Sequence, residues 1–383
     1  MKKIVLLSVL WSSIVIAQSG TEPTAALQNI APPSSPAFVL MDITPSNIIV
    51  PENIQAFSLQ TISAFSGDSS NGLSNNNYAV EFQPYWYVKR ERMDFFKYNN
   101  LTTQKADDSE VTPNDYTGYN IFGDVWKRFS VSMALMNGTF DVLPQAQSYV
   151  SVGARTRLLS FKTKSQINDI KSQYTAYTTF MSSPEVIAIF AKPGLSPSEI
   201  NTAITNLETY KTIVTDFENT LQRKPVFALD VAAAYSHFMG DKNQDLDDAF
   251  GRFGVWASGD LAFYTPTIGT NSHVHIYGVF RYLRDGLNLN EASDLFIETK
   301  TDYGVKMELE LDKLSFAYEY ITRDADDNNE ERSIGSIRYK INKSFTLNGG
   351  FGKNFKSDGE QVVLFGIQWG LDYEPSVVLG AGN

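Results

Sequence analysis

The stretch Tyr303-Gly-Val-Lys-Met-Glu-Leu-Glu-Leu311 alternates apolar residues with small or charged residues along its whole length. After the two polar residues Asp312 and Lys313, Leu314-Ser-Phe-Ala-Tyr-Glu-Tyr-Ile321 repeats the pattern. A period of two predicts β-strands that have one apolar and one polar face. Tilted strands of about ten residues cross a hydrocarbon layer, so this stretch predicts a transmembrane β-barrel.

The same alternation recurs through most of the chain. The expected strands are Ile54–Ala64, Tyr78–Val88, Val125–Leu135, Tyr149–Leu159, Val226–Phe238, Phe253–Tyr264, His273–Leu283, a segment that starts between Leu295 and Tyr303 and ends at Leu311, Ser315–Thr322, Ser333–Ile341, Phe345–Asn354 and Val362–Leu371. We therefore predict an all-β transmembrane barrel of about twelve antiparallel strands over residues 54–383. A soluble β-sandwich is the main structural alternative, because its strands also alternate.

The first residues resemble a targeting signal. Lys2 and Lys3 precede an apolar run, and Ala17 ends a small-residue cleavage pattern, so residues 1–17 are expected to be a signal peptide. Residues 18–53 are expected to be a flexible leader followed by a plug segment. Pro45 and Pro51 exclude a central strand there, so the segment lies either in the lumen or in the periplasm. These features predict the outer membrane of a Gram-negative bacterium.

Two long connections interrupt the strands. Apolar residues at helical spacing predict a helical hairpin over residues 164–224. Ser196, Pro197 and Glu199 supply the N-cap, the N1 proline and the capping-box acid of its second helix. The two helices either pack their apolar stripes against each other or form a docking arm for a periplasmic protein. Residues 89–124 form the second insertion, with an aromatic cluster that includes Phe95, Phe96 and Tyr98.

The lengths of the other connections predict the orientation. The turns Asp312–Lys313 and Asn342–Ser344 are short, as periplasmic turns are in bacterial barrels. The connections Gly240–Arg252 and Asp324–Arg332 are longer and acidic, as expected for loops that face outward. Counted from these, both insertions lie on the periplasmic side.

The amino-acid composition limits the classes of molecule that the protein is expected to bind. The formal net charge of −11 argues against nucleic acid. Aromatic residues make up 13% of the chain, which suits the aromatic girdles of a barrel in contact with membrane lipids and lipopolysaccharide. Cysteine is absent, so disulfides and thiol catalysis are excluded. No cofactor is predicted.

Several strings in the N-terminal half resemble a family of uncharacterised bacterial envelope proteins of the outer-membrane barrel type. They are Ser35-Pro-Ala-Phe38 with Pro45 and Pro51 downstream, Ala79-Val-Glu-Phe-Gln-Pro-Tyr-Trp86, Trp126-Lys-Arg-Phe-Ser-Val-Ser-Met-Ala134 and Gly153-Ala-Arg-Thr-Arg-Leu-Leu159. The resemblance implies an envelope location. It supplies no activity and no functional residues.

Alternation places many charged side chains on the lumen face of the strands. The predicted lumen-lining residues are Glu81, Arg128, Arg155, Arg157, Asp230, Asp260, Arg281, Lys306, Glu308, Glu310, Glu319, Arg338 and Lys340. Because the two signs nearly balance, an ionic ladder that fills a narrow lumen is the favoured interpretation. The alternative is a selective polar channel.

The sequence offers little support for an enzyme. Of the three histidines, His273 and His275 share one strand, and His237 belongs to another. By parity His275 points inward and can pair with Asp260, but no serine nucleophile accompanies it. Oxygen ligands alternate at Asp241, Asn243, Asp245 and Asp247, yet the glycine and glutamate of an EF-hand are missing, which leaves only a loose cation site. We expect no catalysis.

The combined expectation is a non-enzymatic barrel that acts as a scaffold or accessory component of an envelope assembly. The features behind it are the two periplasmic insertions and a lumen filled by balanced charges. A passive or selective channel for small polar solutes is the alternative function.

Overall fold

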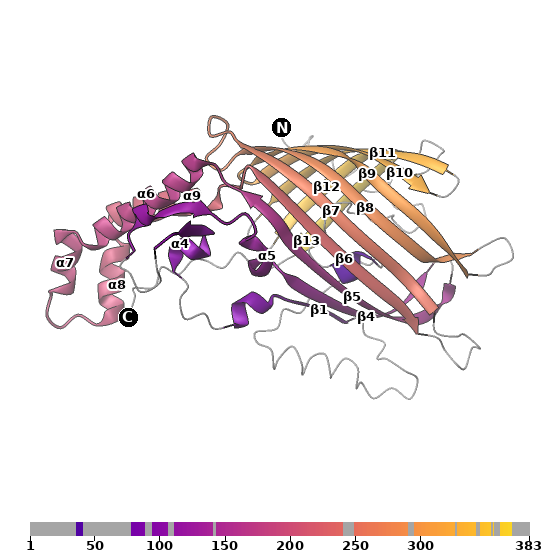
Figure 1. Cartoon of the computed structure of the whole chain (residues 1–383), viewed down its shortest axis with the longest axis horizontal. Helices are drawn as coiled ribbons and strands as arrows, with labels where there is room; N and C mark the ends of the chain where they lie inside the picture. Colours follow the sequence, from indigo (N-terminus) through magenta and orange to yellow (C-terminus); the bar gives the residue numbers. More distant parts are fainter. Residues whose placement is uncertain are drawn as a thin grey trace, which may run out of the picture.

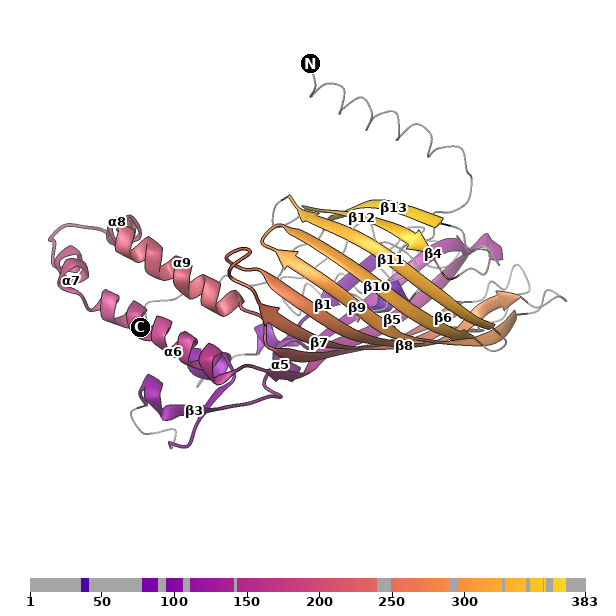
Figure 2. The same cartoon turned by 90° about the horizontal axis from the view of Figure 1, so that it is seen from above.

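The structure is a computed structural model of the whole chain, shown in Figures 1 and 2. It describes residues 36–40, 78–88, 94–105, 111–140, 143–239, 249–289, 295–325, 328–341, 345–353, 355 and 361–369. Among these, no helix is long and apolar enough to cross a membrane. The expected signal peptide, the strand Ile54–Ala64 and the cation candidates Asp241, Asn243, Asp245 and Asp247 lie outside the described residues.

One large antiparallel sheet dominates the molecule. Its eleven strands follow the chain order and pair each with the next. They are β1 (Tyr78–Phe82), β4 (Ser130–Phe140), β5 (Leu143–Phe161), β6 (Phe227–Met239), β7 (Ala249–Tyr264), β8 (His273–Leu289), β9 (Leu295–Leu311), β10 (Leu314–Ala325), β11 (Asn328–Lys340), β12 (Phe345–Lys353) and β13 (Gln361–Trp369). Each corresponds to one expected strand. The antiparallel, β-rich fold is therefore confirmed.

The sheet is strongly curved and its strands are steeply inclined (Figure 1). Within the described residues no ladder joins the two edge strands β1 and β13, so the sheet as described is open. Neighbouring strands pair over most of their length. β8 and β9, for example, pair from His273–Glu310 to Leu289–Leu295.

The prediction of a long acidic loop at Asp324–Arg332 was wrong. β10 continues to Ala325 and β11 begins at Asn328, with Arg323 paired to Glu330 and Asp324 to Asn329. Backbone ladder bonds do not require apolar side chains, and Arg323 also lies within 4.0 Å of Glu330. The polar tips of the two strands therefore stay extended.

One expected strand ends earlier than the sequence indicates, and another begins later. β1 ends at Phe82, and a 3₁₀ turn, η2 (Pro84–Tyr87), follows because Pro84 has no N–H for a ladder. The segment before β4 is the helix α5 (Asp124–Lys127). Asp124 accepts a hydrogen bond from the Asn100 side chain at 2.8 Å and pairs with Lys127 at 2.9 Å, which stabilises a helical turn there.

The insertion between β5 and β6 contains four helices that extend from one end of the sheet (Figures 1 and 2). They are α6 (Lys164–Met181), α7 (Pro184–Phe190), α8 (Pro197–Thr205) and α9 (Glu208–Gln222). The capping box at Ser196 and Glu199 forms as its sequence indicates. The second helix, however, is divided between α8 and α9, because Leu207 adopts an extended conformation.

The other insertion folds as a small unit. α4 (Phe95–Tyr98), the two-stranded sheet β2 (Leu101–Thr103) with β3 (Tyr116–Tyr119), and the 3₁₀ turn η3 (Pro113–Asp115) enclose a core of Phe96, Leu101 and Tyr116. Ile167 and Tyr174 of α6 pack against this core. The Phe95 ring lies 5.0 Å from Tyr174 and 5.2 Å from Phe217 of α9. The helices thus pack on the first insertion as well as on one another.

Candidate functional site

The concave face of the sheet carries buried charged side chains besides apolar clusters, and the convex face exposes many large apolar side chains. On β9 the inward-facing residues Asp302 and Glu308 are buried, whereas Val305 and Met307 between them are 55% and 56% exposed. This is the reverse of a water-soluble sheet, in which apolar side chains are buried and ions are exposed. Further exposed apolar residues on β8 to β12 are Ile276, Phe280, Tyr303, Phe316, Tyr318, Tyr320, Ile337, Tyr339 and Phe351.

Oppositely charged side chains pair across the concave face. Most of the residues predicted to line the lumen belong to these pairs, and several partners were not predicted. The pairs are Glu81–Arg155 at 3.1 Å, Arg157–Asp230 at 2.8 Å, Asp260–His275 at 2.9 Å, Lys306–Glu308 at 2.7 Å, Arg338–Glu308 at 2.5 Å, Arg332–Glu319 at 2.7 Å, Lys340–Glu310 at 3.9 Å and Arg252–Asp285 at 2.8 Å.

The most buried pair of charges has a third member. Both Asp302 oxygens are used: Arg281 Nε donates to Oδ2 at 2.6 Å, and Arg323 Nε donates to Oδ1 at 2.7 Å. The guanidinium carbon of Arg323 also lies 3.7 Å from the centre of the Phe355 ring. One carboxylate thus holds two arginines, with an aromatic face over one of them.

The position predicted for Arg128 was wrong. Arg128 follows α5 as its C-cap, and its N–H donates to Asp124 O, so it precedes β4 and does not belong to the concave face of the sheet. The alternation that suggested a strand there is overridden by the side-chain contacts of Asp124. Burial alone raises the pKa of Asp124, but Lys127 and Asn100 outweigh it and hold the pKa well below its ordinary value.

A short helix lies against the concave face. In α2 (Pro36–Val39) the Ala37 N–H donates to Ser132 Oγ at 3.1 Å. Leu40, next in the chain, packs with Ala232, Ala234 and Trp256, and its carbonyl accepts a hydrogen bond from Arg252 at 3.2 Å. These contacts hold the described residues of this segment against the concave face of the sheet.

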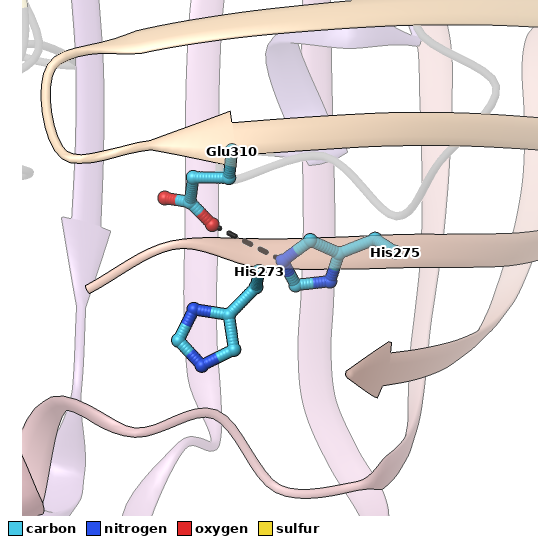
Figure 3. A group of neighbouring side chains, drawn as sticks. All are labelled: His273, His275 and Glu310. Carbon is cyan, nitrogen blue, oxygen red and sulfur yellow. Dashed lines mark hydrogen bonds and ion pairs between the residues drawn. The ribbon is translucent and has the colours of Figure 1, made fainter. Parts of the chain in front are cut away.

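Two histidines and a glutamate meet near the end of β8 that adjoins the helices (Figure 3). His275 Nδ1 lies 2.9 Å from Asp260 Oδ1, and His275 Nε2 lies 3.1 Å from Glu310 Oε2. His273 Nδ1 lies 3.1 Å from the carbonyl oxygen of Asn271. Both histidines are 2% exposed. The pairing of His275 with Asp260 follows from parity, but the approach of Glu310 requires the register of β8 on β9.

Several residues of the buried ion pairs are absent from the predicted lumen residues, among them Arg252, Asp285, Asp302, Arg323 and Arg332. Their signal was parity, because each lies an even number of residues from a predicted inward residue on its strand. Arg252, Asp285, Arg323 and Arg332 lie just beyond the ends of the expected strands, and Asp302 lies in the range where the start of its strand is left open. Comparisons with models of known families, with curated proteins and with solved structures each found no match.

Proposed function

We propose that the chain is an outer-membrane β-barrel that acts as a non-enzymatic scaffold or accessory component of an envelope assembly. The observation that carries the proposal is the apolar convex face. Tyr318 is 57% exposed and Phe351 is 64% exposed, and an exposed apolar surface of this extent is typical of a membrane-facing sheet. The signal-like residues 1–17 and the resemblance to envelope proteins agree with that location.

Closure into a barrel is part of the proposal. A flat sheet in lipid would leave the N–H and C=O groups of its edge strands unpaired, at a cost of several kcal/mol each. The curvature of the sheet favours closure. Membrane lipids and lipopolysaccharide are the partners of the convex face.

The ion-paired concave face favours a filled lumen over an open pore. A channel for small polar solutes needs charges that face water, whereas Arg281, Asp302 and Arg323 satisfy one another in a buried triad. The polarity of the same face is what keeps the channel as the second candidate. Large, stable, ion-selective openings of the unmodified protein in planar bilayers would favour the channel over the scaffold.

The helical insertion is the proposed docking element for a periplasmic protein. On α7, Val186 and Ile189 pack into the core between the helices, while Ile187 and Phe190 are 55% and 53% exposed. Solvent-exposed apolar pairs next to polar residues are common at protein interfaces.

The location is tested by fractionation. The mature chain, beginning near Gln18, is expected to sediment with the outer membrane. Recovery as a soluble periplasmic protein that resists pelleting would contradict both the location and the barrel.

The scaffold role is tested by purification in mild detergent, with the unmodified protein compared with Ile187→Ser/Phe190→Ser. A protein that co-purifies with the former and is lost from the latter supports the role. Glu185→Gln, an exposed change on the same helix, is the matched control. Equal recovery with all three proteins would exclude α7 as the docking element.

A further inference from the structure

The cluster of His273, His275 and Glu310 is built on two adjacent strands. The two histidines are two residues apart on β8, so their side chains leave the same face of the sheet. The β8–β9 ladder pairs His273 directly with Glu310. As a result one ring nitrogen of each histidine and one oxygen of Glu310 lie within 4.8 Å of one another. Ladder hydrogen bonds on both strands fix the backbone beneath these groups.

This donor set has a clear metal preference. Two imidazoles with one carboxylate suit Zn²⁺ and its first-row neighbours, whereas Ca²⁺ and Mg²⁺ prefer oxygen ligands alone. Zinc bonds of about 2.0–2.2 Å place tetrahedral ligand atoms roughly 3.3 Å apart. The three side chains therefore need to close by about 1.5 Å at most, which side-chain rotation supplies without movement of the strands.

The outer contacts also match a metal site. Metal-binding histidines usually donate their second N–H to a carboxylate or a backbone carbonyl, which fixes the ring and its tautomer. Asp260 provides this carboxylate for His275, and the carbonyl of Asn271 provides the acceptor for His273. Because a carbonyl only accepts, the proton of neutral His273 lies on Nδ1 and the lone pair on Nε2. Nε2 of His273 is buried and has no hydrogen-bond partner among the described residues.

We propose that His273, His275 and Glu310 bind a divalent transition-metal ion, with Zn²⁺ the best match. The ion replaces the proton that His275 Nε2 shares with Glu310 in its absence. Three protein side chains hold the ion, and Asp260 and Asn271 orient the two imidazoles. The ligands and their orienting groups lie on β7 to β9 and in the turn before β8, so the site stands independently of the scaffold role proposed above.

The position of the site suggests a structural role for the ion. Asn271, whose carbonyl orients His273, also contacts Asn219 and Gln222 of α9 through its side-chain amide, at 3.3 Å each. Its backbone N–H donates to Asp312 in the β9–β10 turn at 3.0 Å. A bound ion therefore fastens the ends of β8 and β9 where they meet the helical insertion, and the thermal midpoint should rise on binding.

The test uses the full chain, purified in detergent and stripped with a chelator. Zn²⁺ is titrated against a chromophoric chelator, and Co²⁺ is added separately as a spectroscopic probe. We expect one tight equivalent of Zn²⁺ and the intense visible bands of tetrahedral Co²⁺. His273→Gln and Glu310→Gln should each weaken Zn²⁺ binding by at least about tenfold, by analogy with the loss of orienting groups. His237→Gln removes the third histidine, which lies near Tyr235 on β6, and is the matched control.

Two results would overturn the proposal. Uptake of neither metal by the unmodified protein would overturn the proposal and leave a proton as the bridge between His275 and Glu310. Equal loss of binding in His237→Gln would also overturn it, because the ion would then lie elsewhere. Circular dichroism reports whether each variant is folded, and the Co²⁺ spectrum of the unmodified protein decides the question even if a variant fails to fold.

Discussion

At the scale of single residues, Lys162 shows how burial of a charged group lowers the stability of the folded state. It follows β5 directly, and its ammonium group donates to the Arg223 carbonyl at 3.4 Å. Burial lowers the pKa of Lys162 from 10.5 to about 8. Between these two values the unfolded chain binds more protons than the folded one, so the contribution of Lys162 to stability improves as pH rises through this window. Below the window the full cost of the buried charge remains.

Lys162→Met removes this cost. We expect the variant to be more stable than the unmodified protein at pH 7, and the difference to shrink as pH approaches 10.5. Denaturant midpoints measured at both pH values test this expectation, with Lys164→Met at an exposed position as the control. A difference that is equal at the two pH values would mean that new apolar contacts, and not the charge, stabilise the variant.

Asp302 is the residue on which the buried ion network depends. Asp302→Asn leaves Arg281 and Arg323 buried without their shared countercharge. Removing one partner of a buried pair costs about 3–5 kcal/mol, so unfolding should require much less denaturant. Glu208→Gln breaks an exposed pair with Lys211 and should leave the midpoint almost unchanged. Equal midpoints for the two variants would show that the triad adds no stability.

The limits of prediction are also visible at this scale. Alternation identified Glu308 and Arg338 as inward-facing residues, because parity needs only the local sequence. It did not bring Glu310 to His275, because that contact depends on how β8 and β9 are aligned. It misplaced Arg128, because the Asn100–Asp124 hydrogen bond that supports α5 joins residues 24 apart in the chain.

At the scale of elements, the strands were predicted well and the helical insertion less well. A strand is specified by its own period, whereas at the break between α8 and α9 Leu207 packs against a buried cluster drawn from α6, α7 and α8. The helices pack on one another, and α6 also packs against the insertion at residues 94–119. α6 places Tyr174 against Phe96, with ring centres 4.7 Å apart, so the two insertions share one aromatic core.

This shared core leads to a prediction for the helices. Replacing residues 164–225 with a short Gly/Asn turn should preserve the sheet, because β5 and β6 already pair down to Phe161–Phe227 and closing the loop costs little. The aromatic ring of Phe95 would then lose Tyr174 and Phe217, so residues 94–119 should become sensitive to protease. Circular dichroism and limited proteolysis measure the two effects.

A double substitution distinguishes the loss of aromatic packing from the loss of the whole helical insertion. Tyr174→Ala/Phe217→Ala should reproduce the protease sensitivity while keeping the helices. Loss of the strand signal after deletion of residues 164–225 would show instead that the insertion supports the sheet. Unchanged proteolysis in the double variant would mean that the Phe96–Leu101–Tyr116 core is stable without the helices.

At the scale of the whole molecule, the charged concave face and the position of α2 against it lead to one expectation. The concave face is crowded by paired charges, and α2 with Leu40 covers part of β4, β5 and β6. Under the proposed barrel, these two features together keep the lumen closed. The unmodified protein should therefore show little steady conductance in planar bilayers.

Gly153→Val tests the contribution of α2. A Cβ atom on Gly153 would lie 2.7 Å from the Ala37 nitrogen and 2.9 Å from Pro36 Cγ, so the helix has to move away from the concave face. We expect conductance to rise. Gly278→Val on β8 is the matched control, since a Cβ atom there meets nothing within 4 Å. In Gly153→Val, α2 could become accessible to protease while the conductance of the bilayer stays at its low level. That outcome would mean that the ion pairs close the lumen without α2. The next variant to record would then be the combined removal of Glu308, Glu310 and Arg338.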